Sequence, residues 1–231
     1  MIRKSVYTMV YKFIKFISTI IINLFWSVKV EGEDISKYQD SFILAANHVS
    51  YLDPIVLGIV VKRRINFITK KEIYDNPFLN CILKRIGTIP VDKNSTNSAS
   101  IKKSLNLLKD NHILGVFPEG TRSSDGKLLE LNTGMIKIAL QADVPIIPVG
   151  ISGTFEIYPP EAKFPALFKN QCIYINFGKP YSLDKNRRRD TEYIKESLVK
   201  IEDEIKKLAR LSEKEDVDEN YCEVSSYDKY K

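Results

Sequence analysis

Short apolar runs alternate with longer amphipathic stretches along this chain, and this rhythm constrains the fold more than any other feature. The runs have the length of buried strands, whereas the stretches between them carry apolar residues at helical spacing. The expected strands cover residues 41–46, 64–69, 88–91, 113–117, 145–151 and 171–177. The expected helices cover residues 54–61, 77–86, 98–109, 134–142 and 191–211. This alternation predicts a single α/β domain with a largely parallel mixed sheet flanked by helices.

Composition divides the 231 residues into three parts. Residues 30–211 contain the alternating pattern and are expected to form the α/β domain. Residues 212–231 are rich in acidic side chains and lack apolar periodicity, so a disordered tail is expected. Residues 1–29 carry basic side chains and no acidic ones, and the run 16–28 is uncharged.

The N-terminal segment predicts attachment to a membrane surface. As a helix, the uncharged run 16–28 would be about 20 Å long, shorter than the roughly 30 Å hydrocarbon core of a bilayer. Basic residues beside aromatic and aliphatic ones are typical of a helix in the interface of an anionic leaflet. We expect monotopic attachment, by one helix or a bent helix pair, and the alternative is a helix packed on the protein's own core. A signal peptide is disfavoured because no small-residue cleavage site follows.

The loop after the first expected strand contains His48 and Asp53. On one continuous helix these side chains would diverge by roughly 140°. Proline favours the first helical position, so we expect a helix that begins at Pro54 with Asp53 as its N-cap. His48 can then fold back onto Asp53, which leaves one ring nitrogen free to accept a proton. The pair is a candidate general base, and the alternative is a structural histidine beside a plain helix cap.

A second motif, residues 117–123, follows the strand expected over 113–117. Gly120 permits a positive φ or a close backbone approach. The planar guanidinium of Arg122 suits phosphate oxygens, and backbone N–H groups in such a turn add to an anion site. Glu119 can orient Arg122 or the polar head of a substrate. The alternative is a solvated surface turn.

Together the two motifs resemble the glycerolipid acyltransferase superfamily, most closely the bacterial 1-acylglycerol-3-phosphate acyltransferases. Asn47-His48 through Asp53 is similar to the HxxxxD motif of that family, and residues 117–123 are similar to its FPEGTRS motif. Residues 86–93 and 144–149 resemble its two other blocks. Lys93 departs from the arginine that the family commonly has, which keeps the charge but loses the bidentate fork.

The resemblance implies a reaction. His48, oriented by Asp53, would deprotonate the sn-2 hydroxyl of lysophosphatidic acid, which then attacks the thioester of acyl-CoA or acyl carrier protein to give phosphatidic acid. The implied substrate-binding residues are Glu119, Gly120, Thr121, Arg122 and Lys93. Ser50 is expected to form hydrogen bonds within the loop and not to act as a nucleophile. No metal or cofactor is implied beyond the thioester co-substrate, and the expected location is the cytoplasmic face of the cell membrane.

Other functions fit parts of the sequence. The net charge of +6 permits nucleic-acid binding, but the basic residues are dispersed and many lie in the apolar N-terminus, so no nucleic-acid partner is expected. Three alternatives stay open: acylation of another lysophospholipid, a thioesterase in which His48 activates water, and a non-catalytic lipid-binding peripheral membrane protein. His112 is expected in a loop away from His48. The three scattered cysteines favour free thiols in a reducing compartment.

Overall fold

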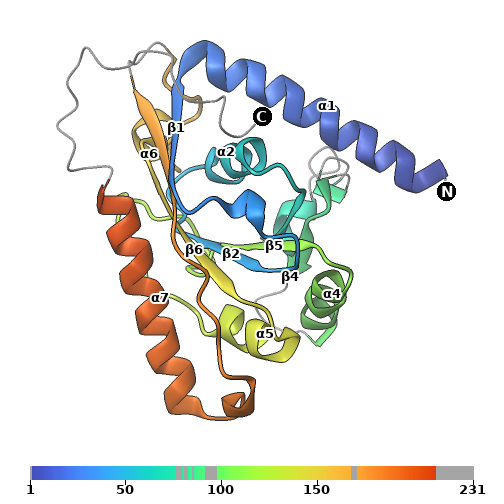
Figure 1. The fold of residues 1–231 in the computed structure, drawn as a ribbon. Helices are drawn as coiled ribbons and strands as arrows, with labels where there is room; N and C mark the ends of the chain where they lie inside the picture. Colours follow the sequence, from blue (N-terminus) through green and yellow to red (C-terminus); the bar gives the residue numbers. More distant parts are fainter. Residues whose placement is uncertain are drawn as a thin grey trace.

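The computed structural model describes residues 2–75, 80, 83, 84, 86–91, 98–167 and 171–211. A seven-stranded sheet in the order β1-β7-β6-β2-β5-β3-β4 forms its centre (Figure 1). The strands are β1 (Ser27–Gly32), β2 (Ile43–Ala46), β3 (Ile65–Lys70), β4 (Ile89–Val91), β5 (Ile113–Val116), β6 (Ile146–Ser152) and β7 (Cys172–Phe177). Neighbouring strands are parallel except β6 and β7, which are antiparallel. The predicted α/β fold with a largely parallel mixed sheet is therefore confirmed.

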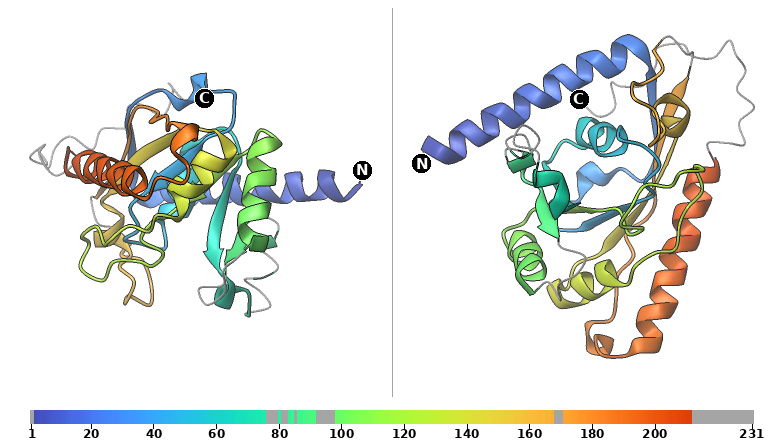
Figure 2. Two further views of the ribbon diagram at one scale, coloured as in Figure 1. Left: turned by 90° about the horizontal axis from the view of Figure 1, so that it is seen from below. Right: turned by 180° about the vertical axis from the view of Figure 1, so that it is seen from behind.

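Helices cover both faces of the sheet (Figure 2). The α-helices are α1 (Ile2–Phe25), α2 (Asp53–Val60), α4 (Ser98–Lys109), α5 (Gly134–Ala142), α6 (Thr154–Ile157) and α7 (Thr191–Leu211). Short 3-10 helices occur at η1 (Ile35–Lys37), η2 (Lys71–Asp75) and η3 (Lys185–Arg187). Apolar side chains of α1 and α2 belong to the hydrophobic cluster on one face, and those of α4, α5 and α7 belong to the cluster on the other. Most of the helix expected over 77–86, and the whole acidic tail, lie outside the described residues.

Strand β2 shows why the strands at the centre of the sheet have apolar residues at successive positions. Ile43 and Ala45 belong to the cluster under α4, α5 and α7, whereas Leu44 and Ala46 belong to the cluster under α1 and α2. Successive side chains of a strand point to opposite faces, so a strand covered on both sides needs apolar residues at every position. All four side chains are buried. The strand that leads into the His48 loop is thus covered on both sides at the centre of the sheet.

Close approach of α7 to the sheet depends on one glycine in β6. A Cβ atom on Gly150 would lie 2.3 Å from the backbone nitrogen of Ala209 in α7, so no larger residue fits without movement of the helix. One face of α7 packs on the sheet, because Ile194, Ile201 and Ile205 are buried. These contacts fix β6, whose carboxyl end adjoins the candidate site.

Helix α1 is one continuous helix of 24 residues, so the bent helix pair considered above is wrong. The segment contains no proline or glycine that would break it. Lys15, one of the basic residues of this segment, turns inward, and its Nζ donates to the carbonyl oxygen of Val61 at 2.7 Å. Ile22 and Trp26 are buried against the domain. Among the described residues, no helix combines the length and apolar character needed to cross a membrane.

Strand β1 is not among the strands expected from the sequence. It pairs in parallel with β7 and extends the sheet at its edge. Val28 and Val30 alternate with Lys29 and Glu31, which is the pattern of a half-buried strand. This short pattern directly follows the apolar N-terminal run, which obscures the change from helical to strand periodicity. Cys172 in β7 forms no disulfide within the described part of the chain, and Cys81 and Cys222 lie outside it.

Candidate active site

The candidate residues lie at the carboxyl ends of three adjacent strands in the middle of the sheet. The loop with His48 follows β2, the loop 117–123 follows β5, and α6 follows β6. Because β2 is parallel to both neighbours, the three connections leave the same edge of the sheet. Sites in open α/β sheets usually lie at this edge.

His48 and Asp53 form the predicted pair. The Nδ1 atom of His48 lies 2.8 Å from Oδ2 of Asp53. The Asp53 side chain is fully buried, whereas that of His48 retains 18% of its accessible surface. The carboxylate favours the tautomer with a proton on Nδ1, which leaves Nε2 as a proton acceptor. The imidazole is therefore oriented and partly accessible, as a general base requires.

The prediction that Asp53 is the N-cap of α2 is wrong. The helix begins at Asp53 itself, one residue earlier than predicted, and its N-cap is Leu52, which has a helical backbone conformation. Its carboxylate instead turns back to the preceding loop. Oδ2 accepts the backbone N–H groups of Val49 and Ser50, both at 2.8 Å. Oδ1 accepts the hydroxyl of Thr154 in α6 at 2.7 Å. Buried N–H groups need an acceptor, and here the carboxylate satisfies those of the loop while it binds His48.

Glu119 joins the two motif loops. Its Oε1 accepts the backbone N–H of His48 at 2.6 Å, and its Oε2 accepts the backbone N–H of Leu129 at 2.9 Å. Burial raises the pKa of the Glu119 carboxyl to about 7, aided by the charge of Asp53 and opposed by the two backbone hydrogen bonds. Both oxygens thus bind the protein's own backbone and position the histidine loop.

Further contacts fix the histidine ring between the same loops. The ring of Phe117 stacks on the His48 imidazole, with centroids 4.0 Å apart and planes inclined by 17°. The backbone N–H of Ser123 donates to the carbonyl oxygen of His48 at 2.9 Å. The base and the proposed anion-binding turn are therefore parts of one bonded unit.

Arg122 lies in this unit with its guanidinium over an aromatic ring. Its Cζ atom is 3.4 Å from the ring centroid of Tyr51, in the histidine loop. Its Nη1 atom is buried and has no hydrogen-bond partner among the described residues. Gly120 has the predicted positive φ, 68°, and Thr121 beside it is exposed. A buried, unpaired N–H donor on a cation is suited to a bound anion.

The side chain of Asn47 connects β2 to the neighbouring strand β6. Its Oδ1 accepts the N–H of Ile151 at 2.7 Å, and its Nδ2 donates to the carbonyl of the same residue at 2.8 Å. Ser50 has the expected role within the loop, because its hydroxyl donates to the carbonyl of Tyr158 and accepts the N–H of Leu52. These bonds fix both ends of the histidine loop.

Comparison with known proteins defines the family. The family described as Acyltransferase matches residues 27–152, more than half of the chain. A 1-acyl-sn-glycerol-3-phosphate acyltransferase from Bacillus subtilis (strain 168) is 32% identical over 171 residues, which are 74% of this chain and 81% of that protein. This chain belongs to the acyltransferase family.

Two other known proteins are similar to this acyltransferase over most of its length. A 1-acyl-sn-glycerol-3-phosphate acyltransferase from Streptococcus pneumoniae is 25% identical over 203 residues, which are 85% of this chain and 73% of that protein. The crystal structure of the 1-acyl-sn-glycerophosphate acyltransferase PlsC from Thermotoga maritima has a TM-score of 0.73. The structural alignment covers 97% of this chain and 85% of the Thermotoga maritima chain, and the two sequences are 23% identical. This last similarity establishes the shared fold.

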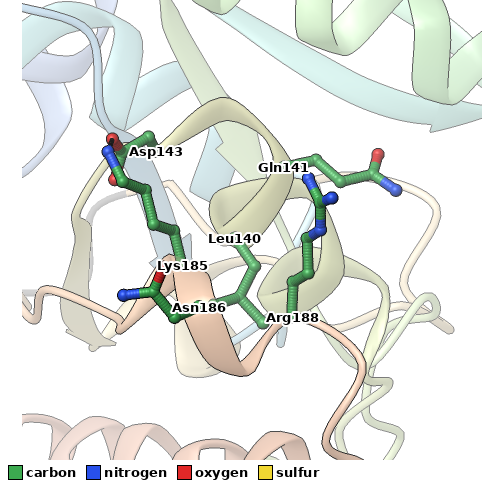
Figure 3. A pocket seen from close by; sticks show the side chains of 6 residues that line it. All are labelled: Leu140, Gln141, Asp143, Lys185, Asn186 and Arg188. Carbon is green, nitrogen blue, oxygen red and sulfur yellow. Dashed lines mark hydrogen bonds and ion pairs between the residues drawn. The ribbon is translucent and has the colours of Figure 1, made fainter.

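A pocket elsewhere on the acyltransferase is separate from this site (Figure 3). It is lined by Leu140, Gln141, Asp143, Lys185, Asn186 and Arg188. Residues 140–143 lie shortly before β6, whereas the loops with His48 and Arg122 follow the ends of β2 and β5. The pocket therefore lies at the opposite edge of the parallel strands. Lys185 and Asp143 form an exposed ion pair across it at 2.6 Å.

Several site residues of the acyltransferase were not predicted, and one predicted residue is not described. Lys93 lies outside the described residues, so its proposed phosphate contact stays a prediction. Thr154 follows the end of β6, and the rule that sites lie at strand ends could have indicated it. The contact of Tyr51 with Arg122 has no local sequence signal. His112 is exposed just before β5, at the edge opposite His48, as predicted.

Proposed function

We propose that this acyltransferase transfers a fatty acyl group from acyl-CoA or acyl carrier protein to the sn-2 hydroxyl of 1-acylglycerol-3-phosphate, which gives phosphatidic acid. The observation that carries the proposal is the His48–Asp53 pair in one bonded unit with Arg122, whose Nη1 has no hydrogen-bond partner among the described residues. The names of the relatives from Bacillus subtilis and Streptococcus pneumoniae support this acceptor.

His48 acts first as a base and then as an acid. Its Nε2 takes the proton of the sn-2 hydroxyl as that oxygen attacks the thioester carbonyl carbon. The carbon–sulfur bond then breaks, and the departing thiolate takes the proton from the imidazolium. Asp53 stabilises the imidazolium through the 2.8 Å contact to Nδ1. No acyl-enzyme is needed, because both substrates are bound together.

The turn after β5 holds the phosphate of the acceptor. Arg122 supplies charged N–H donors, and the turn at Gly120 and Thr121 presents backbone to the same ligand. Lys93 adds a second positive charge in this proposal. Glu119 contributes indirectly, since its oxygens hold the backbone of His48 and Leu129.

The outer face of α1 binds the membrane surface, on the cytoplasmic side. An apolar stripe at helical spacing is exposed there and consists of Met9, Phe13, Phe16, Ile17, Ile20, Ile21 and Leu24. The positive charge of Lys12 is exposed on the same helix. An apolar face with basic side chains suits the interface of an anionic leaflet. The lysolipid then reaches the enzyme from the bilayer that holds it.

An acyl-transfer assay tests the reaction. The purified protein in detergent receives lysophosphatidic acid with acyl-CoA or, separately, with acyl carrier protein, and the lipid products are read by mass spectrometry. We expect phosphatidic acid from the wild type and a loss of at least about 100-fold in His48→Ala, since a positioned general base contributes about 10²–10⁴ in rate. His112→Ala is the matched control and keeps full activity, because His112 is an exposed loop residue at the other edge of the sheet.

Other outcomes would contradict the proposal in distinct ways. Activity only with a different lysophospholipid would change the acceptor but keep the reaction. Release of free fatty acid without transfer would indicate a thioesterase. Equal activity of His48→Ala and the wild type would remove His48 from the mechanism.

A further inference from the structure

Within the described part of the chain, the guanidinium of Arg122 is held by an aromatic ring and not by a carboxylate. Its Cζ atom lies 3.4 Å from the centroid of the Tyr51 ring, which is the distance of a direct stack. Among the described residues Arg122 forms no ion pair, and its buried Nη1 has no hydrogen-bond partner. A stacked guanidinium uses its face and leaves its N–H edge unused.

The Tyr51 ring is itself held in place. It contacts the ring of Tyr158, with centroids 5.2 Å apart. The hydroxyl of the preceding residue, Ser50, donates to the carbonyl oxygen of Tyr158 at 2.7 Å. Tyr51 is 45% exposed, so one part of its ring is accessible while the stacked face is covered. The support of Arg122 therefore comes from the loop that carries His48.

We propose that Tyr51 is a positioning residue that orients Arg122 for the phosphate of the acceptor. A carboxylate partner would occupy the N–H fork and compete with the phosphate, whereas an aromatic face fixes the plane of the guanidinium and leaves all its charge for the ligand. Because Tyr51 lies between His48 and Asp53, the same loop sets the positions of both the base and the phosphate-binding group. The assignment deepens the proposed function and rests on it for the identity of the anion.

Substitutions of Tyr51 separate the ring from its hydroxyl. Tyr51→Phe keeps the stack, so we expect a KM for lysophosphatidic acid close to that of the wild type. Tyr51→Leu loses the stack, and we expect that KM to rise about tenfold, a change typical of a partly buried cation–π contact. The KM for the acyl donor serves as the internal control and is expected to stay within about twofold, because Arg122 binds the acceptor's phosphate in the proposed function.

A graded series guards against misfolding of the leucine variant. Replacement of Tyr51 by phenylalanine and then by 3,4,5-trifluorophenylalanine keeps the ring shape and weakens its negative face. We expect the KM for lysophosphatidic acid to rise with fluorination while the thermal midpoint is unchanged. A purely structural ring would not respond in this way.

A binding measurement distinguishes failure of this inference from failure of the proposed function. In a His48→Ala background, calorimetry gives the Kd for lysophosphatidic acid with and without Tyr51→Leu, and we expect about tenfold weaker binding in the double variant. If the double variant binds more weakly while the wild type transfers no acyl group to any acceptor, the result would support the role of Tyr51 and refute the reaction. The inference would be overturned if the wild type is active and Tyr51→Leu leaves the KM for lysophosphatidic acid unchanged. An unchanged Kd in the His48→Ala background would overturn it as well.

Discussion

At the scale of single residues, Asp53 determines the geometry of the loop that carries His48. Its two oxygens accept hydrogen bonds from His48, from the backbone of Val49 and Ser50, and from Thr154. Four donors fix the carboxylate in one orientation. The imidazole is thus oriented by a group that cannot rotate without breaking several bonds.

Thr154 is the one donor in this set that a substitution can remove cleanly. Thr154→Val keeps the shape but leaves Oδ1 of Asp53 without its 2.7 Å hydrogen bond. We expect kcat to fall about tenfold with little change in KM, since hydrogen bonds to charged groups contribute about 1.5–3 kcal/mol. Thr154→Ser retains the hydroxyl and is the matched control. Steady-state kinetics of the three proteins check this, and equal kcat for all would show that Thr154 does not support the pair.

Glu119 gives the fold a pH dependence. Burial raises the pKa of its carboxyl to about 7, so the native state keeps a proton that the unfolded chain releases near pH 4.5. The native state binds more protons in this window, and the free energy of unfolding therefore falls as pH rises from 4.5 to 7. Glu119→Gln cannot titrate, so it lacks this pH-dependent change in the free energy of unfolding, which amounts to at most about 3 kcal/mol. The amide also places a donor against a backbone N–H, so lower stability of the variant is expected below pH 4.5.

Denaturant unfolding of both proteins across this pH range measures the effect. The difference in the free energy of unfolding between wild type and Glu119→Gln should shrink as pH rises. A difference that is constant with pH would show that the carboxyl titrates at its ordinary pKa.

At the scale of elements, α1 has two faces with different partners. Ile22 and the Nζ of Lys15 contact the domain, while Phe13, Phe16 and Leu24 are exposed to 65%, 61% and 71%. An exposed apolar stripe adds little to folding stability, so the two properties of the helix can be separated by substitution.

Replacing the exposed stripe should abolish membrane binding and spare the fold. For Phe13→Gln, Phe16→Gln and Leu24→Gln together we expect at least tenfold weaker binding to anionic vesicles, because each large apolar side chain contributes about 1.5–3 kcal/mol when removed from water. Val199→Gln on α7 is the matched control, since Val199 is 55% exposed on another surface. Vesicle sedimentation and thermal unfolding check both parts. Unchanged sedimentation of the triple variant would refute the role of α1.

At the scale of the whole molecule, local patterns predicted most elements and the central pair, and tertiary contacts account for what they missed. His48 and Asp53 are five residues apart, and Pro54 indicated a helix start close to the observed one. The contacts of Glu119 with His48 and of Thr154 with Asp53 join segments 71 and 101 residues apart. No local periodicity reports such distances, because the order of strands in the sheet brings these segments together.

The bond between Lys15 and Val61 has a consequence for how the enzyme meets its substrate. It attaches α1 to the end of α2, the helix that begins with Asp53, so the proposed membrane-binding face is linked directly to the element that follows the His48 loop. On the proposed membrane surface such an enzyme searches in two dimensions. Its rate follows the mole fraction of lysolipid in the surface, and diluting that lipid with an inert amphiphile slows turnover although its amount per volume of buffer is unchanged.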